Sequence, residues 1–237
     1  MIARTKRILV ISLFSLFSVS ALAAGGGGSS IGFFIGTTGS TQTDMNSLID
    51  TQNSGSDGPI SAGKLTSAYE FSGHWSYRFS NIMGLHFRPS YFTQTTDGTG
   101  TAGSYDYGIT GFTLFPMMRL FLLENNYIKF FTQVGIGWGF ANGVIQEPGL
   151  KVEFSGNASG FIGGIGAEFC IATVHCINVE GNFRYLPIER MTVDSASGSN
   201  AGSGLSQYLS GEIELGDHDL ASSMSGIMGV LGYTYYF

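Results

Sequence analysis

The last twelve residues of the chain, Gly226 to Phe237, read GIMGVLGYTYYF and indicate the fold class. Counting back from the end, every second residue is apolar or small, and the intervening residues are smaller and more polar near the end. This period of two predicts a β-strand with two different faces. The aromatic cluster of Tyr233, Tyr235 and Phe237 ends the chain without a polar tail. Such an ending suits a barrel strand at a membrane interface, where aromatic girdles lie.

The N-terminus has the pattern of a secretory signal peptide. Arg4, Lys6 and Arg7 precede an apolar run over residues 8–19, and Ala21-Leu22-Ala23 offers small residues at a cleavage site. An uncleaved membrane anchor is the alternative interpretation. The apolar run is short for that role, because a spanning helix needs about 20 residues.

The chain is expected to divide into a signal peptide (1–23), a flexible linker (24–30) and one domain (31–237). Removing the three basic residues of the signal peptide from 11 leaves 8, against 17 acidic residues, so the net charge is −9. This charge argues against nucleic acid as a partner. Charged residues make up 12% of the chain, against about 25% in soluble domains. No stretch after residue 24 is apolar enough for a spanning helix, so the composition predicts a transmembrane β-barrel.

Eight segments of the domain alternate apolar and polar residues. They are expected over residues 31–38, 66–79, 83–95, 107–122, 127–140, 152–170, 177–185 and 220–237. The connections alternate between tight turns near Asn81, Asn125 and Thr173 and long loops over residues 39–63, 96–105, 142–151 and 194–216. Short turns at one end and long loops at the other are typical of outer-membrane barrels. We therefore predict an all-β, eight-stranded antiparallel transmembrane β-barrel. The alternative, ten strands, would need another hairpin within a loop.

The polar faces of these strands carry charged residues that are expected inside the barrel, because the apolar faces must meet lipid. They are Glu70, His74, Arg78, His86, Arg88, Arg119, Lys129, Glu168, Glu180 and Arg184. An eight-stranded barrel is just wide enough for side chains to fill, and buried charges are costly unless they are paired. We expect an ion-pair network that plugs the lumen. A narrow, gated channel through the same residues is the alternative.

Cys170 and Cys176 are the two cysteines of the chain, and they flank the turn at Thr173. A hairpin centred there places them opposite one another and facing inward. Because the periplasm is oxidising, we predict a cross-strand disulfide, with two free thiols as the alternative. A metal site is less favoured, since His175 has the opposite parity, and no cofactor is expected.

The chain resembles the small outer-membrane β-barrel superfamily, which includes OmpX-like and OmpW-like proteins and the barrel domain of OmpA-like proteins. The resemblance covers residues 30–237. It rests on GVLGYTYYF at the end, GGIGAEF from Gly163 and INVEGNFRYLPI from Ile177. It implies an outer-membrane location, in contact with lipid and lipopolysaccharide. It also implies that the barrel assembly machinery reads the terminal signature of Tyr233, Tyr235 and Phe237.

Function is predicted only in part. The leading hypothesis is a structural or surface-exposed protein with a plugged lumen, whose acidic outer loops are available to a host or surface ligand. Their acidic residues are Asp44, Asp50, Asp57, Asp97, Asp106, Asp194, Glu212, Glu214, Asp217 and Asp219. The second hypothesis is a small porin or channel for small or hydrophobic solutes, which the OmpW-like resemblance would allow. A lipid-A-modifying enzyme is a third, carried by His218, Ser222 and Ser223 without a fixed acid partner, so we predict no enzyme.

Overall fold

The computed structural model describes residues 28–55, 60–171, 173–198, 211–216 and 218–237. The predicted signal peptide and most of the predicted linker lie outside these residues. Within the described part of the chain, no helix has the length and apolar character needed to cross a membrane.

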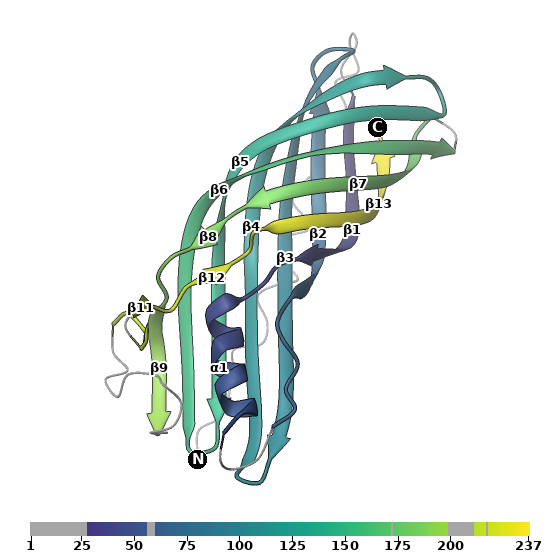
Figure 1. The fold of residues 1–237 in the computed structure, drawn as a ribbon. Helices are drawn as coiled ribbons and strands as arrows, with labels where there is room; N and C mark the ends of the chain where they lie inside the picture. The colour runs from purple at the N-terminus through teal and green to yellow at the C-terminus, as the bar shows by residue number, and fades with distance from the viewer. Residues whose placement is uncertain (1–27, 56–59, 172, 199–210, 217) are drawn as a thin grey trace, which may run out of the picture.

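Eight long antiparallel strands form a closed ring (Figure 1). They are β1 (Ser29–Gly39), β2 (Ser67–Arg78), β3 (Met83–Gly100), β4 (Gly103–Glu124), β5 (Ile128–Glu147), β6 (Leu150–Ile171), β7 (His175–Tyr185) and β13 (Gly226–Tyr236). Each of them pairs with the next, and β13 closes the ring by pairing with β1, from Ser30 opposite Tyr236 to Gly39 opposite Ile227. The predicted eight-stranded all-β fold is confirmed.

The remaining elements lie in the connections that follow β1 and β7. They are α1 (Thr43–Asn53), β8 (Pro187–Ile188), β9 (Thr192–Gly198), β10 (Glu214–Leu215), β11 (His218–Asp219) and β12 (Ser222–Ser223). Strand β9 extends the sheet beyond β6, and β12 pairs with β8. The two ends of the barrel therefore differ. The end with the tight turns and Cys170 is called the disulfide end, and the end with α1 is called the helix end.

The outer surface of the barrel is strongly apolar over most of the eight strands. Ile136 is 69% exposed and Trp138 is 51% exposed, and similar side chains alternate outward on all eight strands. Tyr235 and Phe237 belong to this surface, and Tyr233 is half-buried beside them. An exposed apolar patch of this extent is not stable in water, so this surface requires lipid.

Two of the predicted long loops are wrong. Strand β3 continues to Gly100 and β4 starts at Gly103, while β5 continues to Glu147 and β6 starts at Leu150, so each connection has only two residues. Strands β3 to β6 thus extend at the helix end well beyond β1, β2, β7 and β13 (Figure 1). Consequently Asp97 and Asp106, predicted in loops, lie on β3 and β4. Asp194, also predicted in a loop, lies on β9.

These extensions escaped prediction because the apolar residues change faces along each strand. They point outward near the disulfide end and inward in the extension. Nearer the disulfide end, β4 presents Phe112 outward and Thr113 inward, whereas further out Tyr107 is buried inside and Asp106 is exposed. The extension has water outside and protein inside, so its apolar face is the inner one. Because the outer face of the extension is rich in Thr, Asp and Gly, the amino-acid composition of these segments is that of a loop.

The closing strand is shorter than predicted, since β13 begins at Gly226 and not near Leu220. Ser222 and Ser223 instead pair with Ile188 and Pro187 of β8. Gly226 has a backbone φ of 155°, and a Cβ at this position would lie 1.9 Å from the carbonyl oxygen of Gly39. The chain therefore changes direction at a glycine before it enters the barrel.

Candidate functional site

The structure places all ten predicted lumen residues on the inner face of the barrel. Nine of them are buried, and the side chain of Arg78, near the disulfide end, is 13% exposed. Eight of them, all except the two histidines, take part in ion pairs with one another or with Glu124, a residue that the sequence interpretation assigned to a turn.

Glu180 on β7 lies at the centre of this network. Its Oε1 accepts a hydrogen bond of 2.9 Å from Arg119 Nη2, and its Oε2 accepts from Arg88 Nη2. Arg119 also donates to Glu168 Oε1 at 2.9 Å. The side-chain amide of Gln133 donates to Glu180 and accepts from Arg119, which fixes both groups. Both carboxylate oxygens of Glu180 therefore accept charge-assisted hydrogen bonds, which offset the cost of burying the carboxylate.

Toward the disulfide end, the same network continues to the mouth of the lumen. Lys129 Nζ lies 3.8 Å from Glu168 and 4.0 Å from Glu124. Arg78 makes two hydrogen bonds of 2.7 Å to the carboxylate of Glu124. A cavity of about 10 Å³ remains there between Arg78, Arg119 and their neighbours, which is about the size of one water molecule.

Arg184 and Glu70 form a separate pair between the charged network and the helix end. Arg184 Nη1 donates to Glu70 Oε1 at 2.9 Å, and Thr38 donates to Glu70 Oε2 at 2.9 Å. Arg184 Nε also donates to the carbonyl oxygen of Met224 at 2.6 Å. This pair links β2 and β7 across the lumen to the segment that leads into β13.

Inward-facing aromatic rings complete the network, and the sequence interpretation missed their role. The guanidinium of Arg119 lies 3.8 Å from the ring centre of Phe131, and the ammonium of Lys129 lies 3.6 Å from that of Tyr236. Tyr236 also donates its hydroxyl hydrogen to Glu168. The alternating pattern already assigned these rings to the polar face of their strands. Only the three-dimensional register shows which cation each ring covers.

The helix end is filled with apolar side chains instead of charges. Met45, Leu48 and Ile49 of α1 are at most 1% exposed and pack against the inner faces of the extended strands. Partners in this apolar core include Tyr107, Ile109, Ala141, Ile145, Val152, Phe154, Leu186 and Met224. The helix was not predicted, although apolar residues at positions 45, 48 and 49 have the spacing of an amphipathic helix.

Polar contacts hold this helix-bearing segment in place. The buried side chain of Gln42 donates to Gln94 Oε1 and to the carbonyl oxygen of Ser223, and it accepts from the backbone N–H of Ser223. Gln52 of α1 donates to Glu147 Oε1 of β5 at 3.2 Å, and Tyr107 of β4 donates to the same oxygen at 2.9 Å. Burial of Tyr107, together with that carboxylate, raises the pKa of its hydroxyl above its usual range. The segment is thus an ordered part of the structure.

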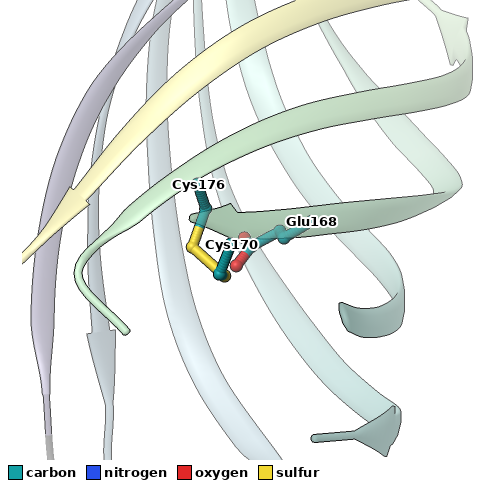
Figure 2. Close-up of side chains that lie close together, drawn as sticks. All are labelled: Glu168, Cys170 and Cys176. Carbon is teal, nitrogen blue, oxygen red and sulfur yellow. A yellow bond between two sulfur atoms is a disulfide. The ribbon is translucent and has the colours of Figure 1, made fainter. Parts of the chain in front are cut away.

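The predicted disulfide between Cys170 and Cys176 is present, and it joins β6 to β7 beside Glu168 (Figure 2). The two sulfur atoms and a carboxylate oxygen lie within 4.8 Å of one another, which is a spacing suited to a metal ion. The residues do not fit that role in this state. The thiols are oxidised, and Glu168 already accepts hydrogen bonds from Arg119 and Tyr236.

The residues considered for catalysis lie at the helix end. His218 Nε2 lies 3.5 Å from Asp44 Oδ1, so the histidine does have an acidic neighbour that the sequence interpretation missed. Ser222 is buried and donates its hydroxyl hydrogen to the amide oxygen of Gln42 at 3.0 Å. An amide oxygen is not a base, so this contact does not activate the serine as a nucleophile.

Comparisons with known proteins relate the chain to outer-membrane barrels through structure alone. No family model and no curated protein sequence matches the chain. The outer membrane protein OprG from Pseudomonas aeruginosa superimposes with a TM-score of 0.58 at 11% identity, over 90% of this chain and 96% of OprG. A major outer membrane protein from Thermus thermophilus gives a TM-score of 0.51 at 12% identity, over 90% of this chain and all of that one. The chain therefore has the fold of the small outer-membrane β-barrel proteins.

Proposed function

We propose that the protein is a structural or surface-exposed barrel of the bacterial outer membrane whose lumen is closed to solutes. The observation that carries this proposal is that the lumen is filled at two levels. Buried ion pairs fill it toward the disulfide end, and the apolar core around α1 fills it at the helix end.

The two levels support closure for different physical reasons. An open path through the network would require Glu180 to separate from Arg88 or Arg119, which leaves an unpaired buried charge at a cost of about 3–5 kcal/mol. An open path at the helix end would require α1 to leave its apolar contacts with strands β4 to β6.

The orientation follows the usual arrangement of such barrels. The tight turns of the disulfide end face the periplasm in this proposal, and the extended strands of the helix end project outside the cell. The outer face of the extension is polar and contains a hollow of about 280 Å³ over strands β3 to β6 and β9. The hollow is lined by Thr95, Thr110, Asn142, Glu153, Asp194 and their neighbours. This surface is the region most available to external ligands.

Planar-bilayer recording of the refolded protein tests the closed lumen. The wild type is expected to show no steady conductance. Glu180→Gln, which removes the counter-charge of Arg88 and leaves Arg119 with Glu168 alone, is expected to show at most brief openings. The matched control is Glu153→Gln, which changes an exposed carboxylate on the outer face. Steady conductance in the wild type that changes with Glu180→Gln and not with Glu153→Gln would contradict the proposal.

A second candidate function is passage of small hydrophobic solutes, and the apolar inner face of the helix end favours it. The rings of Tyr107 and Phe154 and the side chain of Ile145 would provide a suitable surface if α1 moved aside. Uptake of a hydrophobic solute into proteoliposomes tests this function. Uptake that increases when α1 is destabilised by Leu48→Ala would favour the second function over the first.

A further inference from the structure

Within the charged network of the lumen, the cations outnumber the carboxylates. The cations are Arg78, Arg88, Arg119 and Lys129, and their ion-pair partners are Glu124, Glu168 and Glu180. Arg88 and Arg119 share Glu180, while Arg119 and Lys129 share Glu168. One positive charge is therefore left uncompensated in a buried position, and this is costly unless an anion accompanies it.

Arg88 is the guanidinium of this network that is hydrogen-bonded through one nitrogen only. This side chain is 2% exposed and donates through Nη2 to Glu180, while its Nε and Nη1 have no hydrogen-bond partner among the described residues. Its guanidinium carbon lies 4.5 Å from the ring centre of Phe34. One edge of a buried guanidinium thus presents two sets of N–H groups to the interior of the barrel.

Two buried histidines beside Arg88 present further unpartnered nitrogens. The rings of His74 and His86 stack with centres 4.8 Å apart, and the centre of Phe34 lies 5.0 Å from that of His74. Within the part of the chain that the structure describes, His74 Nδ1 and His86 Nε2 have no hydrogen-bond partner. The three polar side chains therefore surround the same inner ring, on neighbouring strands β2 and β3.

The hydrogen-bond network indicates that these nitrogens are donors. Thr234 Oγ1 accepts from Asn178 Nδ2 at 2.6 Å, so its own hydrogen is available to His74 Nε2, 3.3 Å away. His74 then carries its hydrogen on Nδ1. Ser76 Oγ lies 2.7 Å from His86 Nδ1, and when the serine donates to that nitrogen, the hydrogen of His86 is on Nε2.

We propose that a small monovalent anion of the halide class binds inside the lumen, against Arg88, His74 and His86. With both histidines in these tautomers, the site offers N–H donors within a network that carries a surplus positive charge, so its occupant must be an acceptor and is favoured by negative charge. A bound halide balances the four cations of the network and completes the hydrogen bonding of the guanidinium. The anion is a structural ligand of the closed barrel, and its binding does not depend on what the outer surface contacts.

Thermal unfolding of the full barrel, folded in detergent micelles, tests the proposal in sodium chloride, sodium bromide and sodium gluconate at equal ionic strength. The unfolding midpoint of the wild type is expected to rise with halide concentration and to saturate, and gluconate is expected to have no such effect. Arg88→Gln is expected to remain folded, because three cations then face three carboxylates, and to lose the halide response. Lys151→Gln removes an exposed cation and is expected to keep the response.

Anomalous scattering from crystals grown in bromide provides a readout that needs no variant. A bromide peak beside Arg88 and the two histidines supports the site even if Arg88→Gln does not fold. The proposal is overturned if halide and gluconate act alike on the wild type, or if the halide response persists in Arg88→Gln. It is also overturned if crystals show only water beside Arg88, or bromide only elsewhere.

Discussion

At the scale of single residues, Glu180 is the most connected carboxylate of the described lumen. It accepts hydrogen bonds from Arg88, Arg119, Gln133 and Asn182, which lie on β3, β4, β5 and β7. Glu180 is 3% exposed, so water does not replace any of these partners. A single side chain thereby ties strand β7 to β3, β4 and β5 across the interior.

Replacing Glu180 by Gln is expected to lower the free energy of unfolding by about 3–5 kcal/mol, because Arg88 and Arg119 lose their shared buried counter-charge. Urea unfolding of the barrel folded in detergent measures the change. The control Glu153→Gln, at an exposed ion pair with Lys151, is expected to stay within about 0.5 kcal/mol of wild type. Equal stability of the two variants would show that the network does not support the fold.

At the scale of elements, the hairpin of β6 and β7 lies at the disulfide end of the barrel, and the helix α1 lies in the apolar core of the helix end. The hairpin is held by the register that pairs Cys170 with Cys176, and the helix is held by its apolar face. These two elements respond to different perturbations, so their contributions can be measured separately.

The double variant Cys170→Ser/Cys176→Ser is expected to lose about 2 kcal/mol of stability, since the disulfide closes only a short loop and restricts the unfolded chain modestly. Unfolding with and without a thiol reductant measures this. The reductant is expected to destabilise the wild type by a similar amount and to leave the serine variant unchanged. A reductant effect on the serine variant would assign the loss to something other than this bond.

Leu48→Ala in α1 is expected to loosen the helix end by about 2–5 kcal/mol, because Leu48 is 1% exposed in the apolar core. Trypsin cleavage after Lys64, which lies on the surface of the same connection, is expected to become faster. Ser47→Ala, at an exposed position of the same helix, serves as the control. Unchanged cleavage in Leu48→Ala would mean that α1 is not what holds this connection closed.

At the scale of the whole molecule, the barrel has two environments stacked along one axis. Where lipid is expected outside, the charges lie inside, and where water is expected outside, the apolar core lies inside. The closing contact is the pairing of β13 with β1, which brings the last residues of the chain beside the first described ones. The chain can close only after its C-terminal strand has been made.

Deleting Phe237 is expected to reduce the amount of assembled protein in the outer membrane, because the aromatic ending is the proposed assembly signature and Phe237 also donates its backbone N–H to Ser29. Quantifying the heat-modifiable band in outer-membrane fractions measures this. Phe237→Tyr keeps the ring and the backbone and is expected to assemble normally. Normal levels of the truncated protein would contradict the signature.

The sequence by itself determined the ring of eight strands, the face on which each charge lies and the pairing of Cys170 with Cys176. All three follow from a period of two, which is local and survives without knowledge of distant contacts. It did not determine the extended hairpins or α1, because their apolar faces turn toward the interior and their outer faces have the composition of loops.

Only the tertiary structure decided which partners the lumen charges have. The parity of Arg88 puts it inside the barrel, but that it shares Glu180 with Arg119 depends on residues 61 and 92 positions apart in the chain. The register of the closed ring sets these distances, and with them which nitrogens of Arg88 are left without a partner among the described residues. The physical reason is that alternation fixes the direction of a side chain, whereas ion pairing depends on the distance between strands that meet only when the barrel closes.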